Sequence, residues 1–184
     1  DKFVYMPSVV SSDIKEKEIL TLNNNYNELE NLRIRREGEF GKQEFLVGEL
    51  ARQGSKLVHQ NNYDNDFKNE TTKVLVETAL ALLIKDSDEE EIDLLLTLPI
   101  SAYHNHKEDF KQAFLNKEIN IDLYDYAEQE YNTIKFKINN VIVKQQGFTA
   151  YIDEILNSNG NIKEEKEEFI EGLASVIDIG FYST

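Results

Sequence analysis

Asp178 and Gly180 lie two residues apart at the end of an apolar run, and together they could handle a phosphate group. The run is rich in β-branched residues, which predicts a strand buried on both faces. It consists of Val176, Ile177 and Ile179. A carboxylate is a hard oxygen ligand, so Asp178 could hold Mg²⁺ through water. Gly180 has no Cβ, so phosphate oxygens could approach the backbone N–H groups there.

Two hydroxyl residues, Ser183 and Thr184, follow the glycine and could add hydroxyl and amide donors to the same site. An Asp-x-Gly sequence also ends many strands for purely structural reasons, so the motif needs support from the rest of the chain. The sequence ends within the motif, and we expect the chain to be a fragment of a longer protein.

The composition predicts one soluble globular domain. The chain has 184 residues, of which 40% are hydrophobic, and no apolar stretch approaches the roughly 18 residues that cross a bilayer. The net charge of -15 would repel phosphate backbones, so we expect no direct contact with nucleic acid. The absence of cysteine excludes disulfides and thiolate metal sites and fits a reducing cytoplasm. We expect neither a signal peptide nor membrane contact.

In the first half of the chain, hydrophobic patterning predicts strands at 3–10, 31–36 and 45–48. We expect the last two strands to pair as a hairpin or meander. A short helix is expected at 49–52, ending near Gly54. A wide apolar face at helical spacing predicts a long helix over 71–85, with Thr71 or Thr72 as its N-cap.

In the second half, the apolar segment 92–98 is too short for a typical helix and predicts a central buried strand that ends at Pro99. The remaining pattern predicts helices and strands in alternation. Helices are expected at 103–115, 148–156 and 164–173, and strands at 119–123, 131–136 and 138–143, with a connection around Asn139-Asn140. This order indicates an α/β fold, a mixed β-sheet with flanking helices.

Two further clusters contain residue types that could form a site. His104 and His106 are spaced to point to different faces of a helix, so we expect solvated histidines rather than a zinc site. Tyr124, Tyr126 and Tyr131 are interleaved with acidic residues. We expect these rings to pack on a neighbouring strand, and a filament or partner contact is the alternative. No Rossmann or P-loop motif is present.

Four segments resemble, in order and spacing, segments of bacterial actin-like proteins. They are 45–51, 94–99 with the helix after it, 143–147, and 176–184. The first resembles a strand end of the form VGE-x-A, and the third resembles the segment that carries a water-positioning Gln or Glu. The fourth resembles the second phosphate loop. Together, over residues 3–184, they resemble the N-terminal half of a ParM/StbA-type plasmid segregation actin.

The resemblance implies an actin-like ATPase domain of ribonuclease H-like fold that takes ATP and Mg²⁺. By position in the family motifs, Asp178 would hold Mg²⁺ through water and help orient the attacking water. Gly180, with Ser183 and Thr184, would contact the β- and γ-phosphates. Gln146 would position the nucleophilic water, and its neighbour Gln145 is the alternative.

The resemblance also implies what the chain lacks and what it assembles with. Residues 1–184 would form the first domain, without the first phosphate loop and without the second domain, so we expect the isolated chain to bind ATP weakly or not at all. The parent protein would assemble into filaments and use a DNA-binding adaptor. The alternatives are a chaperone-like or cell-division ATPase, and a non-catalytic interaction module of the same fold.

Overall fold

The computed structural model describes residues 2–12, 14, 29, 31–38, 41–54, 59–60, 69–87 and 90–167. The chain divides into two compact units. Unit 1 comprises Asp1–Asp93 and Phe114–Asn140, and unit 2 comprises Leu94–Ala113 and Val141–Thr184. One seven-stranded sheet has the order β4-β1-β3-β2-β6-β7-β5. Its strands are β1 Val9–Ser11, β2 Leu32–Gly38, β3 Gly41–Val47, β4 His59–Gln60, β5 Glu91–Leu98, β6 Lys117–Asp125 and β7 Glu130–Gln145.

The expected hairpin is confirmed by β2 and β3, which pair antiparallel from Leu32↔Val47 to Gly38↔Gly41. The chain then turns at Gly48, whose φ of 66° lies in the region that glycine adopts without steric cost. Helix α2 (Glu49–Gly54) follows at once, as the sequence predicts. Of the strand predicted at 3–10, only Val9 and Val10 belong to β1, and the described residues before them lie outside the sheet. Strand β1 pairs with both β3 and β4, so it is not the edge strand that Pro7 suggested.

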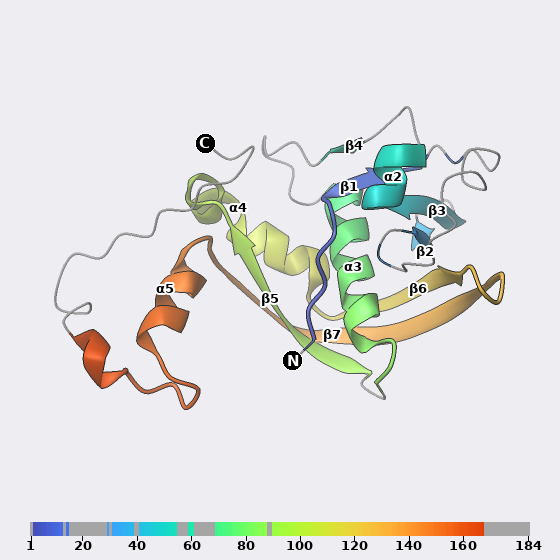
Figure 1. Cartoon of the computed structure of the whole chain (residues 1–184). Coiled ribbons are helices and arrows are strands. Elements are labelled where there is room, and N and C mark those ends of the chain that lie inside the picture. The colour runs from blue at the N-terminus through green and yellow to red at the C-terminus, as the bar shows by residue number, and fades with distance from the viewer. Residues whose placement is uncertain are drawn as a thin grey trace. The chain divides into compact units, whose positions relative to one another are not determined.

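Helix α3 (Glu70–Ile84) covers the apolar face of the sheet in unit 1 (Figure 1). It contacts β1 and β6, and its Val74, Ala81 and Leu82 are buried. The N-cap is Asn69, whose side chain accepts a hydrogen bond from the backbone N–H of Thr72 at 2.7 Å. The expectation that Thr71 or Thr72 caps this helix is therefore wrong, and the helix begins earlier because an asparagine fills the cap role.

Strand β5 confirms the strand predicted at 92–98, but the prediction of a central buried strand is wrong, because among the described strands β5 lies at the edge of the sheet and is not buried on both faces. Leu94 and Leu98 are buried, whereas Leu95 is exposed. The backbone N–H of Lys137 donates to the Glu90 carbonyl at 2.7 Å, and that of Gln146 donates to the Leu98 carbonyl at 2.7 Å. Residue numbers rise together along both strands, so β5 and β7 run parallel, while the other assigned pairs are antiparallel. The sheet is mixed, as expected.

Strand β7 corrects the prediction of two strands joined around Asn139-Asn140, because it is continuous over Glu130–Gln145. The buried positions change phase there, from Phe136 and Ile138 to Val141. The two hydrogen bonds to β5 show the same shift. Their donors, Lys137 and Gln146, are nine residues apart on β7, whereas their acceptors, Glu90 and Leu98, are eight residues apart. The extra residue is a β-bulge, which shifts the side-chain alternation without ending the strand.

The helices of unit 2 follow β5 and β7. Helix α4 (Ile100–Phe114) starts directly after Pro99, whose carbonyl accepts hydrogen bonds from the N–H groups of Ala102 and Tyr103 at 3.0 Å. Helix α5 (Phe148–Ile155) matches the prediction. A 3₁₀ turn, η2 (Glu164–Lys166), occupies the start of the predicted helix 164–173, and the rest of that prediction lies outside the described residues.

No helix in the described part of the chain has the length and hydropathy required to cross a membrane.

Candidate functional site

Gln146 lies in the two-residue turn between β7 and α5, so the segment predicted to carry the water-positioning residue has the expected strand–turn–helix form. The next residue, Gly147, has φ of 84° and serves as the N-cap position of α5. A side chain is disfavoured at this φ, so glycine is what allows the chain to leave the strand and start the helix within two residues. The side chain of Gln146 is exposed, whereas that of Gln145, the last residue of β7, is half-buried.

The turn is fixed to the neighbouring strand through its backbone. The N–H of Gln146 donates to the carbonyl of Leu98, the last residue of β5. The carboxyl ends of two parallel strands therefore meet at Gln146, with Pro99 and the start of α4 following β5. In α/β sheets, ligands bind at the carboxyl ends of the strands. The side-chain amide of Gln146 has no hydrogen-bond partner among the described residues, so it can serve a ligand or water.

The far end of α5 is held by Lys163. Its ammonium group donates to the carbonyl oxygens of Asp153 and Glu154, both at 3.0 Å. A cation at this end of a helix donates hydrogen bonds to the carbonyl groups that have no partner within the helix, and it interacts favourably with the helix dipole. Lys166 forms an ion pair with Glu154 as well. The short helix after Gln146 is therefore restrained at both ends.

The phosphate-binding residues expected from the sequence, Asp178, Gly180, Ser183 and Thr184, lie outside the described residues. The strand expected over 176–179 also lies outside the described residues. His104 and His106 both lie in the first turns of α4. In the described part of the chain, no three His, Cys, Asp or Glu side chains are grouped to hold a metal ion.

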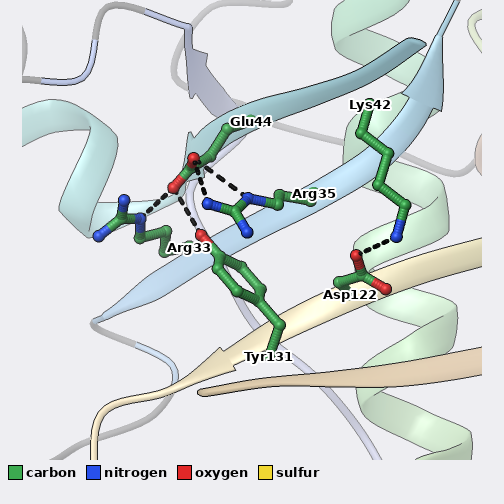
Figure 2. A network of polar contacts seen from close by, with 6 residues as sticks. All are labelled: Arg33, Arg35, Lys42, Glu44, Asp122 and Tyr131. Carbon is green, nitrogen blue, oxygen red and sulfur yellow. Dashed lines mark hydrogen bonds and ion pairs between the residues drawn. The ribbon is translucent and has the colours of Figure 1, made fainter. Parts of the chain in front are cut away.

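A second polar cluster, centred on Glu44, lies on the face of unit 1 opposite α3, as Figure 2 shows. The Glu44 carboxylate pairs with Arg33, accepts a hydrogen bond from Arg35 Nη2 at 3.2 Å, and accepts another from the Tyr131 hydroxyl at 2.5 Å. Burial disfavours the charged carboxylate, but the hydrogen bonds from Tyr131 and Arg33 outweigh it and lower the pKa of Glu44. Burial and the hydrogen bond to Glu44 raise the pKa of Tyr131.

Beside this cluster, Asp122 is buried between two donors. Lys42 Nζ donates to one carboxylate oxygen at 2.8 Å, as Figure 2 shows. The Thr133 hydroxyl donates to the other carboxylate oxygen at 2.7 Å. Burial opposes ionisation, yet the bonds from Lys42 and Thr133 prevail and lower the pKa of Asp122. Each carboxylate in these clusters is thus satisfied by neighbours from other strands, which indicates a stabilising role rather than a vacant binding site.

The tyrosines of the 124–131 region pack within their own sheet, as expected. The Tyr124 ring makes edge-to-face contacts with Tyr126 and Tyr131, with centroids 4.8 and 4.9 Å apart. The guanidinium of Arg35 lies 3.9 Å from the Tyr131 ring centroid. Tyr126 packs against a buried cluster that includes Leu46. Its buried hydroxyl has no hydrogen-bond partner among the described residues, and burial raises its pKa to about 12.

Solved structures of actin-like proteins are similar to this chain. A ParM filament from Clostridium botulinum is 26% identical, with a TM-score of 0.62, and the match covers 83% of this chain and 44% of that chain. Alp7A is 16% identical over 89% of this chain and 45% of that chain, with a TM-score of 0.60. An AlfA filament bound to AMPPNP is 18% identical over 88% and 58%, with a TM-score of 0.50. These last two show likeness of fold alone.

This chain spans less than half the length of the ParM chain that it matches. No curated protein sequence matches it. The family described as the N-terminal domain of actin-like proteins matches residues 1–148, which is most of the chain. Its fold, a mixed sheet with flanking helices, agrees with this match. The chain therefore belongs to the actin-like protein family and carries its N-terminal domain.

Proposed function

We propose that residues 1–184 are the first domain of an ATP-dependent, filament-forming actin-like protein that acts in plasmid DNA segregation in the cytoplasm. The observation that carries this proposal is the similarity to the ParM filament protein together with the family match. Filament assembly is supported by the ParM match, because that structure is itself a filament.

In this proposal the parent protein binds ATP with Mg²⁺, and Gln146 positions the water that attacks the phosphate. The position of Gln146 fits this role, because its side chain is exposed at the carboxyl ends of β5 and β7 while its backbone is held by Leu98. A carboxamide can both donate to and accept from one water molecule. Phosphoryl transfer depends mainly on positioning and charge stabilisation, so a fixed turn carrying one polar side chain is sufficient for this part of the task.

The phosphate contacts are assigned to the end of the chain. Asp178 would hold Mg²⁺ through water, and Gly180, Ser183 and Thr184 would offer backbone and hydroxyl donors to the β- and γ-phosphates. When bound, the metal would supply neutralisation of phosphate charge. These assignments follow from the resemblance of residues 176–184 to the second phosphate loop of the family.

A separate adaptor is proposed to connect the filament to DNA. With a net charge of -15, this part of the protein repels a phosphate backbone. A DNA-binding partner would remove the need for direct contact. The filament itself would be made of copies of the same protein.

Sedimentation of the full-length protein with and without Mg-ATP tests the proposal. We expect pelleting that requires ATP, and we expect Asp178→Ala to abolish ATP turnover. Absence of pelleting well above the concentrations typical of cytoskeletal proteins would favour a chaperone-like ATPase. Turnover that is unaffected by Asp178→Ala would refute the assignment of Asp178, and a protein without any turnover would be a non-catalytic module.

A further inference from the structure

A tight turn rich in asparagine follows helix α5 in unit 2. The backbone N–H of Gly160 donates to the Asn157 carbonyl at 2.9 Å, which is the hydrogen bond of a β-turn. The N–H of Asn157 donates to the Asn161 carbonyl at 2.8 Å. An isolated β-bridge between Leu156 and Ile162 closes the loop just outside this turn. The loop therefore returns the chain to the end of α5.

The three asparagines of this turn differ in what their side chains contact and in which residue follows them. The side-chain oxygen of Asn157 accepts hydrogen bonds from the N–H groups of Asn159 and Asn161, both at 3.0 Å. Asn159 is exposed, and its carboxamide has no hydrogen-bond partner among the described residues. Asn161 is followed by Ile162, whereas Asn159 is followed by Gly160. Of the three, only Asn159 combines a free carboxamide with a glycine after it.

A free carboxamide before glycine can react with its own backbone. The backbone nitrogen of Gly160 loses its proton to solvent base and attacks Cγ of Asn159, and ammonia leaves as a succinimide ring forms. Water then opens the ring at either carbonyl and gives aspartate or isoaspartate. Ring closure needs room around the attacking nitrogen, which glycine allows because it has no Cβ. Among the described residues, no atom lies within 4 Å of the place that a Cβ on Gly160 would occupy, so this side of the turn is open.

The closed turn opposes this reaction, because the attacking nitrogen is bound. The Gly160 N–H must leave the Asn157 carbonyl before the nitrogen can turn toward the Asn159 side chain. The two hydrogen bonds that the Asn157 side chain accepts stabilise the closed form. Exposed segments with few buried contacts open locally at little cost in free energy. Residues 157–160 are all exposed, so the turn opens readily, and Asn157 controls how often it does.

We propose that Asn159 is a site of spontaneous deamidation and that Asn157 slows the reaction by holding the turn closed. The inference does not depend on the proposed function. The product adds a negative charge, and isoaspartate also lengthens the main chain by one carbon before Gly160. The extra carbon changes the span of the β-turn and weakens its hydrogen bond. The loop leads to Lys163, whose ammonium donates to the last carbonyls of α5, so the modification loosens this end of the helix.

Peptide mapping of the full-length protein, kept folded at mildly alkaline pH for several days, tests the proposal. Trypsin cleaves after Lys144 and Lys163, so one peptide, 145–163, carries all three asparagines. We expect Asn159 to gain about 1 Da and to give aspartate and isoaspartate forms that separate by chromatography, while the other two asparagines keep their mass. Asn159→Gln is the control and should keep its mass, because glutamine would have to close a larger ring.

Asn157→Ala tests the part of the proposal that concerns the turn. One hydrogen bond changes an equilibrium by about fivefold, and this variant removes two of them. Deamidation of Asn159 should therefore become at least about fivefold faster. Ser158→Ala is the matched control, because it changes an exposed side chain in the same turn and keeps the Asn157 carboxamide.

Equal rates in the native protein, Asn157→Ala and Ser158→Ala would overturn the role of Asn157. Conversion of Asn157 or Asn161 as fast as that of Asn159 would overturn the choice of residue. A folded protein that stays unmodified while the urea-unfolded protein is converted would overturn the site itself, since the closed turn would then prevent the reaction.

Discussion

The Tyr131 hydroxyl donates a hydrogen bond to the Glu44 carboxylate at 2.5 Å, although two strands lie between the strands that carry them. Glu44 is on β3 and Tyr131 on β7, with β2 and β6 in between. Neighbouring strands are about 4.8 Å apart, so both side chains must lie along the sheet to meet. The Tyr131 ring passes over the guanidinium of Arg35 on the way. The contact thus joins strands that share no backbone hydrogen bonds.

Tyr131→Phe should lower the free energy of unfolding by about 1–2 kcal/mol, because it removes one donor from a charged, partly buried acceptor. The ring and its contact with Arg35 remain in the variant, so the change reports the hydroxyl alone. Urea denaturation gives the measurement. Tyr5→Phe is the control, because Tyr5 is 83% exposed and should lose nothing. Equal effects of the two substitutions would show that the bond to Glu44 contributes no stability.

The stabilisation from Glu44 should depend on pH. Its pKa lies below the ordinary value of 4.5, since the bonds from Tyr131 and Arg33 outweigh the effect of burial. The unfolded chain therefore binds the proton first as pH falls, and the stabilisation is complete above pH 4.5 and lost below it. The difference in free energy of unfolding between the native protein and Glu44→Gln should therefore decrease as pH falls from about 6 to about 3. A difference in free energy of unfolding that stays constant over this pH range would contradict the lowered pKa of Glu44.

Glu77 and Glu70 on α3 both pair with Arg36, and they should differ in their contribution to stability. Arg36 holds buried Glu77 through two hydrogen bonds, at 2.7 and 3.0 Å, while Glu70 is exposed. Burial raises the pKa of Glu77 despite this pairing. Glu77→Ala leaves a largely buried guanidinium without its main partner and should cost about 3 kcal/mol.

Glu70→Ala is the matched control on the same helix and the same arginine. An exposed ion pair contributes at most about 1 kcal/mol. Thermal or urea unfolding of both variants measures the difference. A cost for Glu70→Ala as large as that for Glu77→Ala would mean that burial does not set the strength of these pairs.

The sequence predicted the elements whose signals are local. The hairpin β2–β3 follows from alternation around Gly38 and Gly41, and helix α3 from its apolar spacing. The strand and the helix on either side of Gln146 follow from apolar patterning, and only the role of Gln146 comes from the family resemblance. The Glu44 cluster was missed because Glu44 and Tyr131 are 87 residues apart and meet only through the order of the strands. A partial signal existed, since Arg33 and Arg35 alternate on a strand whose hairpin register brings Glu44 opposite Arg35.

The error at Asn139-Asn140 has a physical cause. A β-bulge and a turn both interrupt the alternation of apolar residues, and asparagine is common in turns. Only the hydrogen bonds to β5 distinguish the two, and those depend on a strand more than forty residues earlier. Strand β5 was predicted to be buried because its composition is apolar, and that composition does not reveal whether both faces are covered within this chain.

Gly147→Ala should destabilise the protein by about 1–2 kcal/mol, because φ of 84° is strained for any residue with a Cβ. The strain falls on the turn that holds Gln146, so ATP turnover of the full-length protein should fall as well. Urea denaturation gives the first measurement and a phosphate-release assay the second. Thr149→Ala, in the first turn of α5, changes a side chain without this constraint and should have little effect. An unchanged stability of Gly147→Ala would show that the turn tolerates another conformation.

Gln146→Ala tests the role proposed for the turn. Loss of a group that positions the attacking water should slow ATP turnover by on the order of 10²-fold, while ATP-dependent pelleting persists, because the fold and the surfaces between subunits are unchanged. Gln145→Ala is the control, since that side chain is half-buried within β7 and should leave turnover within about twofold. A larger loss of ATP turnover from Gln145→Ala than from Gln146→Ala would assign the water-positioning role to Gln145. Equal ATP turnover in both variants and the native protein would exclude a role for this turn in ATP hydrolysis. The turn at the ends of β5 and β7 would then only connect strand and helix.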